Sequence, residues 1–283
     1  QTTASAISAC LVGSEMCIRD RSEIVKFENI GNVTLLTLND PDRLNALSLE
    51  MISELHRYVK MIINNELETR CLVITGAGRG FCAGANLIEG AGQSSFEDID
   101  PGKALEEHYH PFLIDLKNLK IPLITAVNGV AAGAGCSLGI FGDIVYAAKT
   151  SYFYQAFKFI GLVADASSTF VIPRKIGMAR ALEFSLIGEK VAADKALDWG
   201  LINHVVEDDK LMSTVMDAAT NLAEGPTVAL GLMKQLYWDS FANTFEEQIS
   251  AESKAQTIAG KTEDSKIGVM SFIQKQKAKF KGK

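Results

Sequence analysis

The stretch "IPLITAVNGVAAGAGCSLGIFGDIVYAA", residues 121–148, indicates the fold class. It contains an apolar strand, a glycine turn, a helix of small residues and a second apolar strand. Strands that are apolar on both faces are typical of buried sheets, and their carboxyl ends open into crevices where ligands bind. A similar strand and glycine loop occur earlier, in "RCLVITGAGRGFCAGANL", residues 70–87. The sequence therefore predicts an α/β protein with layered strands and helices.

The segments on either side extend this pattern. "IVKFENIGNVTLLTLND", residues 24–40, predicts a hairpin that turns at Asn29–Asn32. The spacing of apolar residues then becomes that of a helix, and Ser48 is the predicted N-cap of this helix. Its apolar face is predicted to consist of Leu47, Met51, Leu55, Tyr58, Ile62 and Ile63. After Thr169 the chain is mostly helical, so we expect a core over residues 22–220 and a helical C-terminal region over 221–283.

Composition narrows the possible functions. The chain has 283 residues, with 47% hydrophobic and 22% charged residues, as in an ordinary globular protein. A net charge of −6 argues against a nucleic-acid partner, and no apolar run is long enough for a membrane span. The cysteines are scattered, form no CxxC pair and have no histidine at metal spacing, so we expect no metal site and a reducing, cytoplasmic location. Cys82 and Cys136 are predicted to be small buried residues.

The first 21 residues differ from the rest. "QTTASAISACLVGSEMCIRDR" lacks a basic segment before an apolar one, so it is a poor signal peptide. Back-translation of "EMCIRDR" gives a sequence that resembles a transposase adapter of sequencing libraries. We therefore expect residues 1–21 to be a non-native extension.

The two glycine loops allow three interpretations. Gly78–Ala83 formally fits a dinucleotide fingerprint, but a strand and a helix precede it and further glycines interrupt the segment after it, which disfavours this interpretation. The loops could instead serve only close packing around small residues. They could also expose backbone N–H groups, at Ala85 and Ala134, that converge on one oxygen as an oxyanion hole. Spacing alone does not decide between the last two.

Five motifs, taken in order, resemble the enoyl-CoA hydratase/isomerase (crotonase) superfamily. They are "PDRLNALS", "GRGFCAGANL", "VNGVAAGAGCSLGIFGDIVYAA", "GLVADASSTFVIPRKIG" and "ALDWGLINHVV". The resemblance covers residues 24–283 and implies a spiral of ββα units with a helical C-terminal region that forms trimers, often paired as hexamers. It also implies an acyl-CoA substrate, no further cofactor, and oxyanion donors at Ala85 and Ala134.

The same resemblance implies a set of substrate contacts. "PDRLNAL" and "CAGANL" are expected to lie beside the CoA, although Arg43 could equally be a surface cation. Matched by position, the expected substrate-binding residues are Arg43, Leu44, Ala46, Ala83, Asn86, Leu87, Val130, Ser137 and Phe157. The segment "EEHYHPF", residues 106–112, often lines the acyl pocket in relatives.

The departures from the hydratase pattern concern the catalytic carboxylates. Ser137 and Phe157 stand where a typical hydratase has two glutamates, and hydration usually needs two carboxylates. Asp165 stands where the isomerases of the family carry their acid. Set among apolar neighbours, it is expected to be partly desolvated, with a raised pKa. The alternative is that Asp165 is only the N-cap of the following helix.

The resemblance favours an isomerase that shifts a double bond or rearranges an epoxide, with Asp165 as acid and base. The chain looks most like the epoxide isomerases of the family, although these have Gly-Gly where it has Ser167-Ser168. A hydratase of relaxed specificity and a non-catalytic acyl-CoA-binding protein remain as alternatives.

Overall fold

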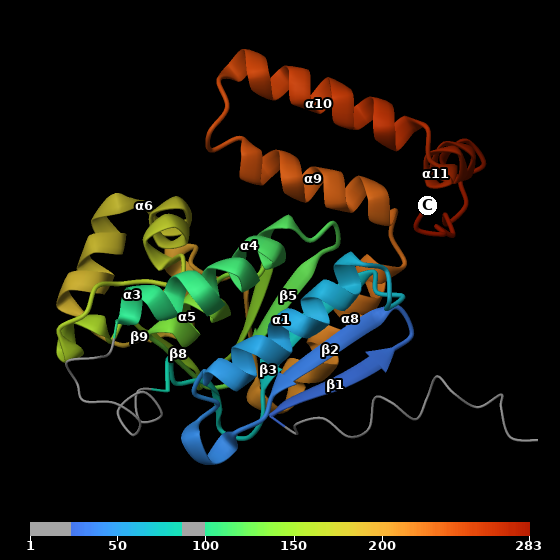
Figure 1. Cartoon of the computed structure of the whole chain (residues 1–283). Helices are drawn as coiled ribbons and strands as arrows, with labels where there is room; N and C mark the ends of the chain where they lie inside the picture. Colours follow the sequence, from blue (N-terminus) through green and yellow to red (C-terminus); the bar gives the residue numbers. More distant parts are fainter. Residues whose placement is uncertain (1–23, 87–99) are drawn as a thin grey trace, which may run out of the picture.

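The computed structural model describes residues 24–86 and 100–283. The proposed extension over residues 1–21 lies outside this part of the chain, and so does Leu87. Two sheets form the body (Figure 1). The six-stranded sheet has the order β1 (Val25–Ile30), β2 (Val33–Leu38), β3 (Cys71–Gly76), β5 (Leu123–Val127), β7 (Ile144–Ala148) and β10 (His204–Val206). The four-stranded sheet has the order β4 (Gly80–Cys82), β6 (Val130–Ala132), β8 (Tyr152–Tyr154) and β9 (Val191–Ala192).

The chain alternates between the two sheets. β3, β5 and β7 run parallel in the larger sheet, and each is followed by β4, β6 or β8 in the smaller one. The segments after these strand pairs are α3 (Pro101–Ala104) with the π-helix η3 (Leu105–Tyr109) and α4 (His110–Asn118), then α5 (Ala134–Gly139), then α6 (Ser168–Ile187). This is the expected spiral of ββα units. The dinucleotide alternative is wrong, because Gly80–Cys82 forms strand β4 and does not open a helix.

The N-terminal predictions hold in most details. β1 and β2 pair as an antiparallel hairpin in which Ile30 lies opposite Val33. α1 (Leu49–Ile63) begins after Ser48, whose hydroxyl accepts a hydrogen bond from the Met51 amide at 3.0 Å. The predicted apolar face is buried except at Ile63, the last residue of the helix, which is 43% exposed. The expectation for Ile63 was wrong because it lies about 100° around the helix from buried Ile62, at the edge of the apolar face in the last turn.

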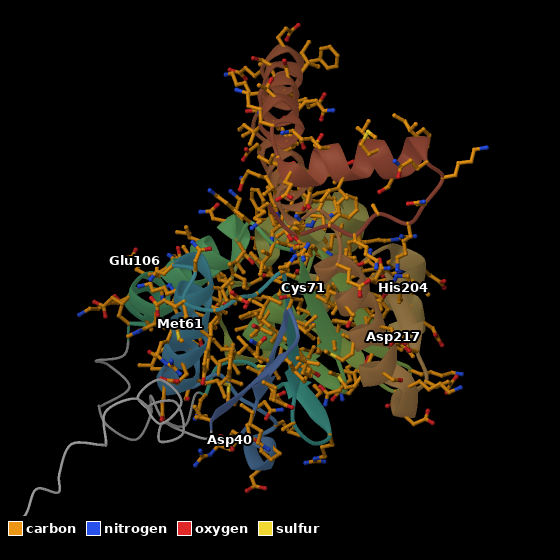
Figure 2. The ribbon with its side chains drawn as sticks, turned by 90° about the vertical axis from the view of Figure 1, so that its right-hand side faces the viewer. Asp40, Met61, Cys71, Glu106, His204 and Asp217 are labelled. Carbon is orange, nitrogen blue, oxygen red and sulfur yellow. The ribbon has the colours of Figure 1, made fainter. Side chains whose placement is uncertain are left out.

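Helices cover both faces of the larger sheet. α1 and α4 lie on one face, over a core that includes Leu55, Leu72 and Leu116. α8 (Leu211–Ala223) lies on the other face, where Val215 and Ala219 pack around Cys71, which Figure 2 labels in the middle of the body. Cys71, Cys82 and Cys136 are all fully buried, and burial raises the pKa of each thiol to about 12. The prediction that Cys82 and Cys136 are buried residues is confirmed.

Three helices follow the body, and the first of them packs against it through Lys234 and Trp238. α9 (Thr227–Asp239), α10 (Phe245–Gly260) and α11 (Glu263–Ile273) follow α8 and extend from one end of the molecule (Figures 1 and 2). α7 (Ala193–Trp199) and the short helices η1 (Pro41–Arg43), η4 (Phe157–Ile160) and η5 (Asp208–Lys210) complete the fold. Among the described residues, no helix combines the length and apolar character that a membrane crossing requires.

Candidate active site

The first glycine loop is held by a buried asparagine. Asn45 has a left-handed backbone, with φ 56°, and its side-chain amide donates to the carbonyl oxygens of Ala77 and Gly80 at 2.9 and 2.8 Å. Backbone bonds join the same segment to the loop: Leu47 N–H donates to Gly84 O at 2.7 Å, and Ala83 N–H donates to Leu44 O at 2.9 Å. Residues 44–47 and 83–86 therefore form one unit.

The second glycine loop contacts the first. A Cβ atom built on Gly84 would lie 2.9 Å from the Ala132 carbonyl oxygen and 3.7 Å from the Ala134 nitrogen. Ala134 opens α5 after Gly133, whose φ of 51° suits glycine. Within the described chain, neither the Ala85 N–H nor the Ala134 N–H donates a hydrogen bond. Two available backbone donors thus belong to loops that touch.

Asp165 lies in an unusual stretch of backbone. The two residues after it, Ala166 and Ser167, both have left-handed conformations, with φ of 48° and 73°. Both residues have a Cβ atom, so a left-handed backbone is unfavourable for them, and the surrounding structure must offset the free-energy cost. α6 begins at Ser168 and its cap position is Ser167, without a capping side-chain bond. The alternative that Asp165 caps this helix is wrong.

Ser137 joins Asp165 to the second glycine loop. Its hydroxyl is fully buried and its single proton is shared between two acceptors, the Asp165 carbonyl oxygen at 3.1 Å and the Gly133 carbonyl oxygen at 3.3 Å. Ser137 is one helical turn after Ala134. α5 therefore both offers the N–H group of Ala134 at its first residue and fixes the backbone of Asp165 through Ser137.

The carboxyl group of Asp165 is partly buried and incompletely hydrogen bonded. Burial raises its pKa to about 6, and the nearby charge of His110 lowers it by a smaller amount. Asp165 Oδ1, Ser167 Oγ and Ser168 Oγ are buried atoms without a hydrogen-bond partner among the described residues. Buried polar groups are normally paired, so these three atoms have hydrogen-bonding capacity that a ligand could use.

The raised pKa that the flanking sequence predicted is confirmed, but only part of the shielding comes from the expected neighbours. Ala166 is buried, whereas Leu162 and Val163 are 39% and 82% exposed. Further shielding comes from elsewhere in the chain. Tyr109, at the end of η3, is buried close enough to Asp165 that the carboxylate charge adds to the effect of burial in raising the tyrosine pKa. A π-helical turn is itself frequent at functional sites.

Comparison with known proteins gives a family for this arrangement. Residues 28–283 match the family model described as enoyl-CoA hydratase/isomerase. The chain belongs to this family. It is 41% identical over 251 residues to the 1,2-epoxyphenylacetyl-CoA isomerase of Escherichia coli, covering 89% of this chain and 95% of that protein. It is also 35% identical over 259 residues to a probable enoyl-CoA hydratase of Rhodobacter capsulatus, covering 92% and 98%.

Solved structures agree with this assignment. The fold matches a putative enoyl-CoA hydratase/isomerase from Mycobacterium abscessus with a TM-score of 0.84 at 32% identity, over 92% of this chain and all of that one. The protein is therefore an enoyl-CoA hydratase/isomerase family enzyme with the crotonase fold.

The crotonase fold brings together most of the residues that the sequence singled out. Leu44 and Val130 flank Gly80, because a Cβ built there would lie 3.3 Å from Leu44 Cδ2 and 3.0 Å from Val130 Cγ1. Phe157 is buried, and its ring faces the start of α5 near Gly133. Ala46, Ala83 and Asn86 are partly exposed in the unit that joins the first loop to residues 44–47.

Two of the expected substrate contacts have other partners or surroundings in the crotonase fold. The side chain of Arg43 is 64% exposed and pairs with Asp40 at 3.3 Å. Ser137 is fully buried and bonded to backbone carbonyl oxygens. The sequence did not single out Asn45 or Tyr109. Asn45 is far from the glycine loop in the sequence, so nothing local signals its role. The pattern of segment 106–112 indicates only a pocket lining.

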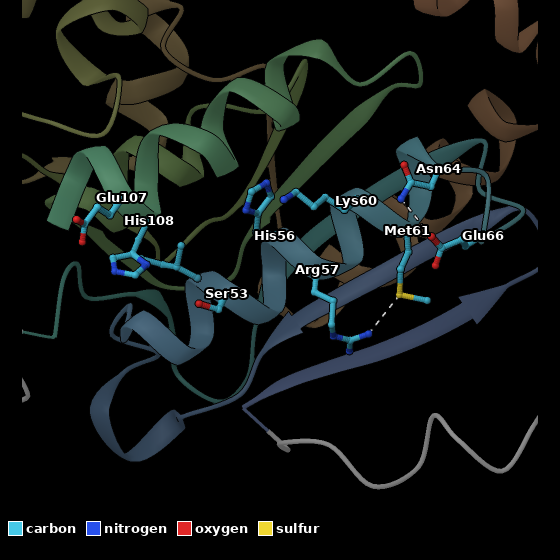
Figure 3. A pocket seen from close by; sticks show the side chains of 10 residues that line it. Ser53, His56, Arg57, Lys60, Met61, Asn64, Glu66, Glu107 and His108 are labelled. Atoms are coloured by element: carbon cyan, nitrogen blue, oxygen red, sulfur yellow. Dashed lines mark hydrogen bonds between the residues drawn. The ribbon is translucent and has the colours of Figure 1, made fainter. Parts of the chain in front are cut away.

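Two cavities formed by described residues lie away from Asp165. One, of about 460 Å³, opens along α1 and is lined by His56 and Arg57 of this helix and by Glu107 and His108 of η3; Figure 3 shows Arg57 turned towards Met61. Its His56 Nε2 lies 2.7 Å from Asp115 Oδ2. The other, of about 400 Å³, lies under α9. Asp165 itself is not in the lining of either cavity.

Proposed function

We propose that this enzyme is an acyl-CoA isomerase, in which Asp165 is the acid and base and the N–H groups of Ala85 and Ala134 form the oxyanion hole. Asp165 removes a proton from a carbon near the thioester and returns it at another carbon. The negative charge that develops on the thioester oxygen is stabilised by the two backbone donors. A raised pKa suits this exchange, because a group that titrates near the working pH can both accept and donate a proton.

The observation that carries the proposal is the presence of one carboxylate with a raised pKa at matched catalytic positions. Ser137 is buried against two carbonyl oxygens, and Phe157 presents a ring. Neither side chain can activate water or deliver a proton. This favours isomerisation over hydration, although one relative carries the name of a probable hydratase.

The decisive test is a parallel assay of three thioesters. The enzyme is given a 3-enoyl-CoA, a 2-enoyl-CoA and 1,2-epoxyphenylacetyl-CoA, and the products are separated by liquid chromatography. We expect turnover of the 3-enoyl-CoA or of the epoxide. Hydration of the 2-enoyl-CoA should be at least about 100-fold slower, because the enzyme lacks the second carboxylate that hydration usually needs. Hydration as the fastest reaction would favour a hydratase of relaxed specificity. Binding without any turnover would favour a non-catalytic acyl-CoA-binding protein.

Ser137 provides a second test, as a positioning residue. In Ser137→Ala we expect kcat to fall about tenfold with KM changed less than about twofold, because Asp165 loses the bond that fixes its backbone while the substrate contacts remain. The matched control is Ser151→Ala, which removes another buried hydroxyl that donates to a carbonyl oxygen, that of Ala148. Both variants should lose similar thermal stability. A kcat reduced equally in both would mean that Ser137 acts only through stability.

The C-terminal helices support an oligomer in this proposal. Large apolar side chains are exposed along α10 and α11, among them Phe245, Phe272 and Ile273, which are 75%, 84% and 66% exposed. Exposed apolar surface of this kind marks protein interaction sites. It supports a homotrimer, or two trimers paired as a hexamer, as the family resemblance implies.

A further inference from the structure

The cavity under α9 lies at the opposite end of the strands from the glycine loops. Pro122 and Ile144 line it at the beginnings of β5 and β7, whereas the loops follow the ends of β3 and β5. α6 contributes Lys175 and α9 contributes Trp238. At about 400 Å³ the cavity is in the range of sites for small ligands.

The charges on its wall do not balance. Asp143 Oδ2 accepts from the Leu123 amide at 2.8 Å and pairs with Lys234 Nζ at 3.0 Å. The side chain of Lys234 is only 7% exposed. Lys175 faces the same single carboxylate, but its ammonium group has no hydrogen-bond partner in the described part of the chain. Lys175 is half-buried, and it shares the one carboxylate of Asp143 with Lys234, so the wall carries more positive than negative charge.

Arg174 does not correct this imbalance. Its guanidinium stacks 3.5 Å from the ring centre of Phe170 and 4.9 Å from that of Phe241, and it donates to the Phe170 carbonyl oxygen. It adds positive charge at the rim of the cavity and supplies no acceptor.

The remaining wall is apolar and aromatic. Trp238 stacks on Phe141 with ring centres 5.7 Å apart and lies edge-on to Phe241 at 6.4 Å. Val171 and Leu230 also line the cavity. Apolar pockets with a few converging polar groups are the usual form of small-molecule sites.

We propose that this cavity binds a small carboxylic acid with an apolar body, whose carboxylate pairs with Lys175 while the body packs against Trp238 and Phe141. A carboxylate supplies the missing negative charge and the hydrogen-bond acceptor. The aromatic wall removes the rest of the ligand from water. The site is separate from Asp165 and does not depend on the reaction catalysed there.

The first experiment measures octanoate binding to the intact enzyme by tryptophan fluorescence. The chain has two tryptophans, so a Trp199→Phe background leaves Trp238 as the reporter. We expect octanoate to change this fluorescence saturably and octan-1-ol to bind at least about tenfold more weakly, because it lacks the charge that pairs with Lys175. Equal binding of acid and alcohol, or no binding of octanoate, would overturn the proposal.

Variants locate the site. Lys175→Gln should weaken octanoate binding about tenfold or more, whereas Lys26→Gln, an exposed lysine on β1, should leave it unchanged. Asp165→Asn should also leave octanoate binding unchanged, because the proposed site is separate from Asp165. Only octanoate bound in the catalytic pocket would respond to that change. If Asp165→Asn weakens binding and Lys175→Gln does not, the acid is in the catalytic pocket and the proposal is wrong.

The pH dependence gives an independent readout. Burial lowers the pKa of Lys175 to about 8, an effect that Asp143 opposes less strongly. A carboxylate favours the charged lysine, so binding should be strongest below pH 8 and weaken above it. Lys175→Arg keeps the charge and should flatten this dependence between pH 7 and 9. The other ionisable groups facing the cavity are Asp143, Arg174, Lys234 and Tyr237. A dependence that persists in Lys175→Arg would arise from them and contradict pairing with Lys175.

Discussion

Asp165→Asn is expected to lower the isomerase kcat by about 10³-fold, since positioned acid–base groups contribute roughly 10²–10⁴ to such rates. Asparagine has nearly the same size but cannot take up or return a proton. The measurement is steady-state kinetics on the thioester that the wild-type enzyme turns over best. The wild-type rate should rise with pH through about 6 and then level off, because the carboxyl group, whose pKa is about 6, acts as a base only when ionised.

The same change should stabilise the fold at neutral pH. The folded-state pKa of Asp165 is about 6, above the value of about 3.9 for an unfolded chain. A raised pKa means that the acid contributes most to stability below pH 4, and that this contribution is lost as pH rises through 6. Asparagine does not ionise, so the variant keeps its stability as the pH rises through 6. Because the group is partly exposed, we expect a gain on the order of 1 kcal/mol at pH 7.

Thermal unfolding at two pH values checks this gain. The variant should melt higher than wild type at pH 7, with the difference vanishing near pH 4. A lower melting temperature at pH 7 would mean that Asp165 has a structural role, and a variant with full turnover would show that it is not the base.

Gly84→Ala is expected to lower kcat about 10²-fold, the usual effect of losing one oxyanion donor. The added Cβ would lie 2.9 Å from the Ala132 carbonyl oxygen, and Gly84 has φ of 105°. The carbonyl belongs to β6 and cannot rotate away, so the first loop must move and take the Ala85 N–H away from Ala134. Steady-state kinetics on the same thioester measures the loss.

Gly161→Ala is the matched control for this variant. Gly161 also has a left-handed backbone, with φ of 70°, but no atom lies within 4 Å of an added Cβ. It therefore tests the conformational cost of alanine, about 1–2 kcal/mol, without the contact between loops. Equal kcat in the two variants would argue against an oxyanion hole at this place.

The elements of this protein could be predicted from sequence where the signal is local. Ser48 caps α1 because a hydroxyl at that place reaches the amide three residues on, and the apolar runs of β3 and β5 are buried on both faces. The order of the five motifs was specific enough to indicate the family and its spiral fold. The partial burial of Asp165 was predicted correctly, but not which residues cause it, since Val163 is exposed and Tyr109, far away in the sequence, lies near the acid.

The order of residues alone shows two glycine loops after apolar strands, and the family resemblance predicts from it one acid, Asp165, at the isomerase position and no glutamate at the two hydratase positions. Folding in three dimensions was needed to show that Gly84 packs close to the Ala132 carbonyl oxygen, that Ser137 holds the Asp165 backbone and that Lys175 faces a carboxylate already paired with Lys234. The physical reason is that such contacts join segments far apart in the chain. Their distances depend on how the sheets and helices pack, which no residue pattern within one segment records.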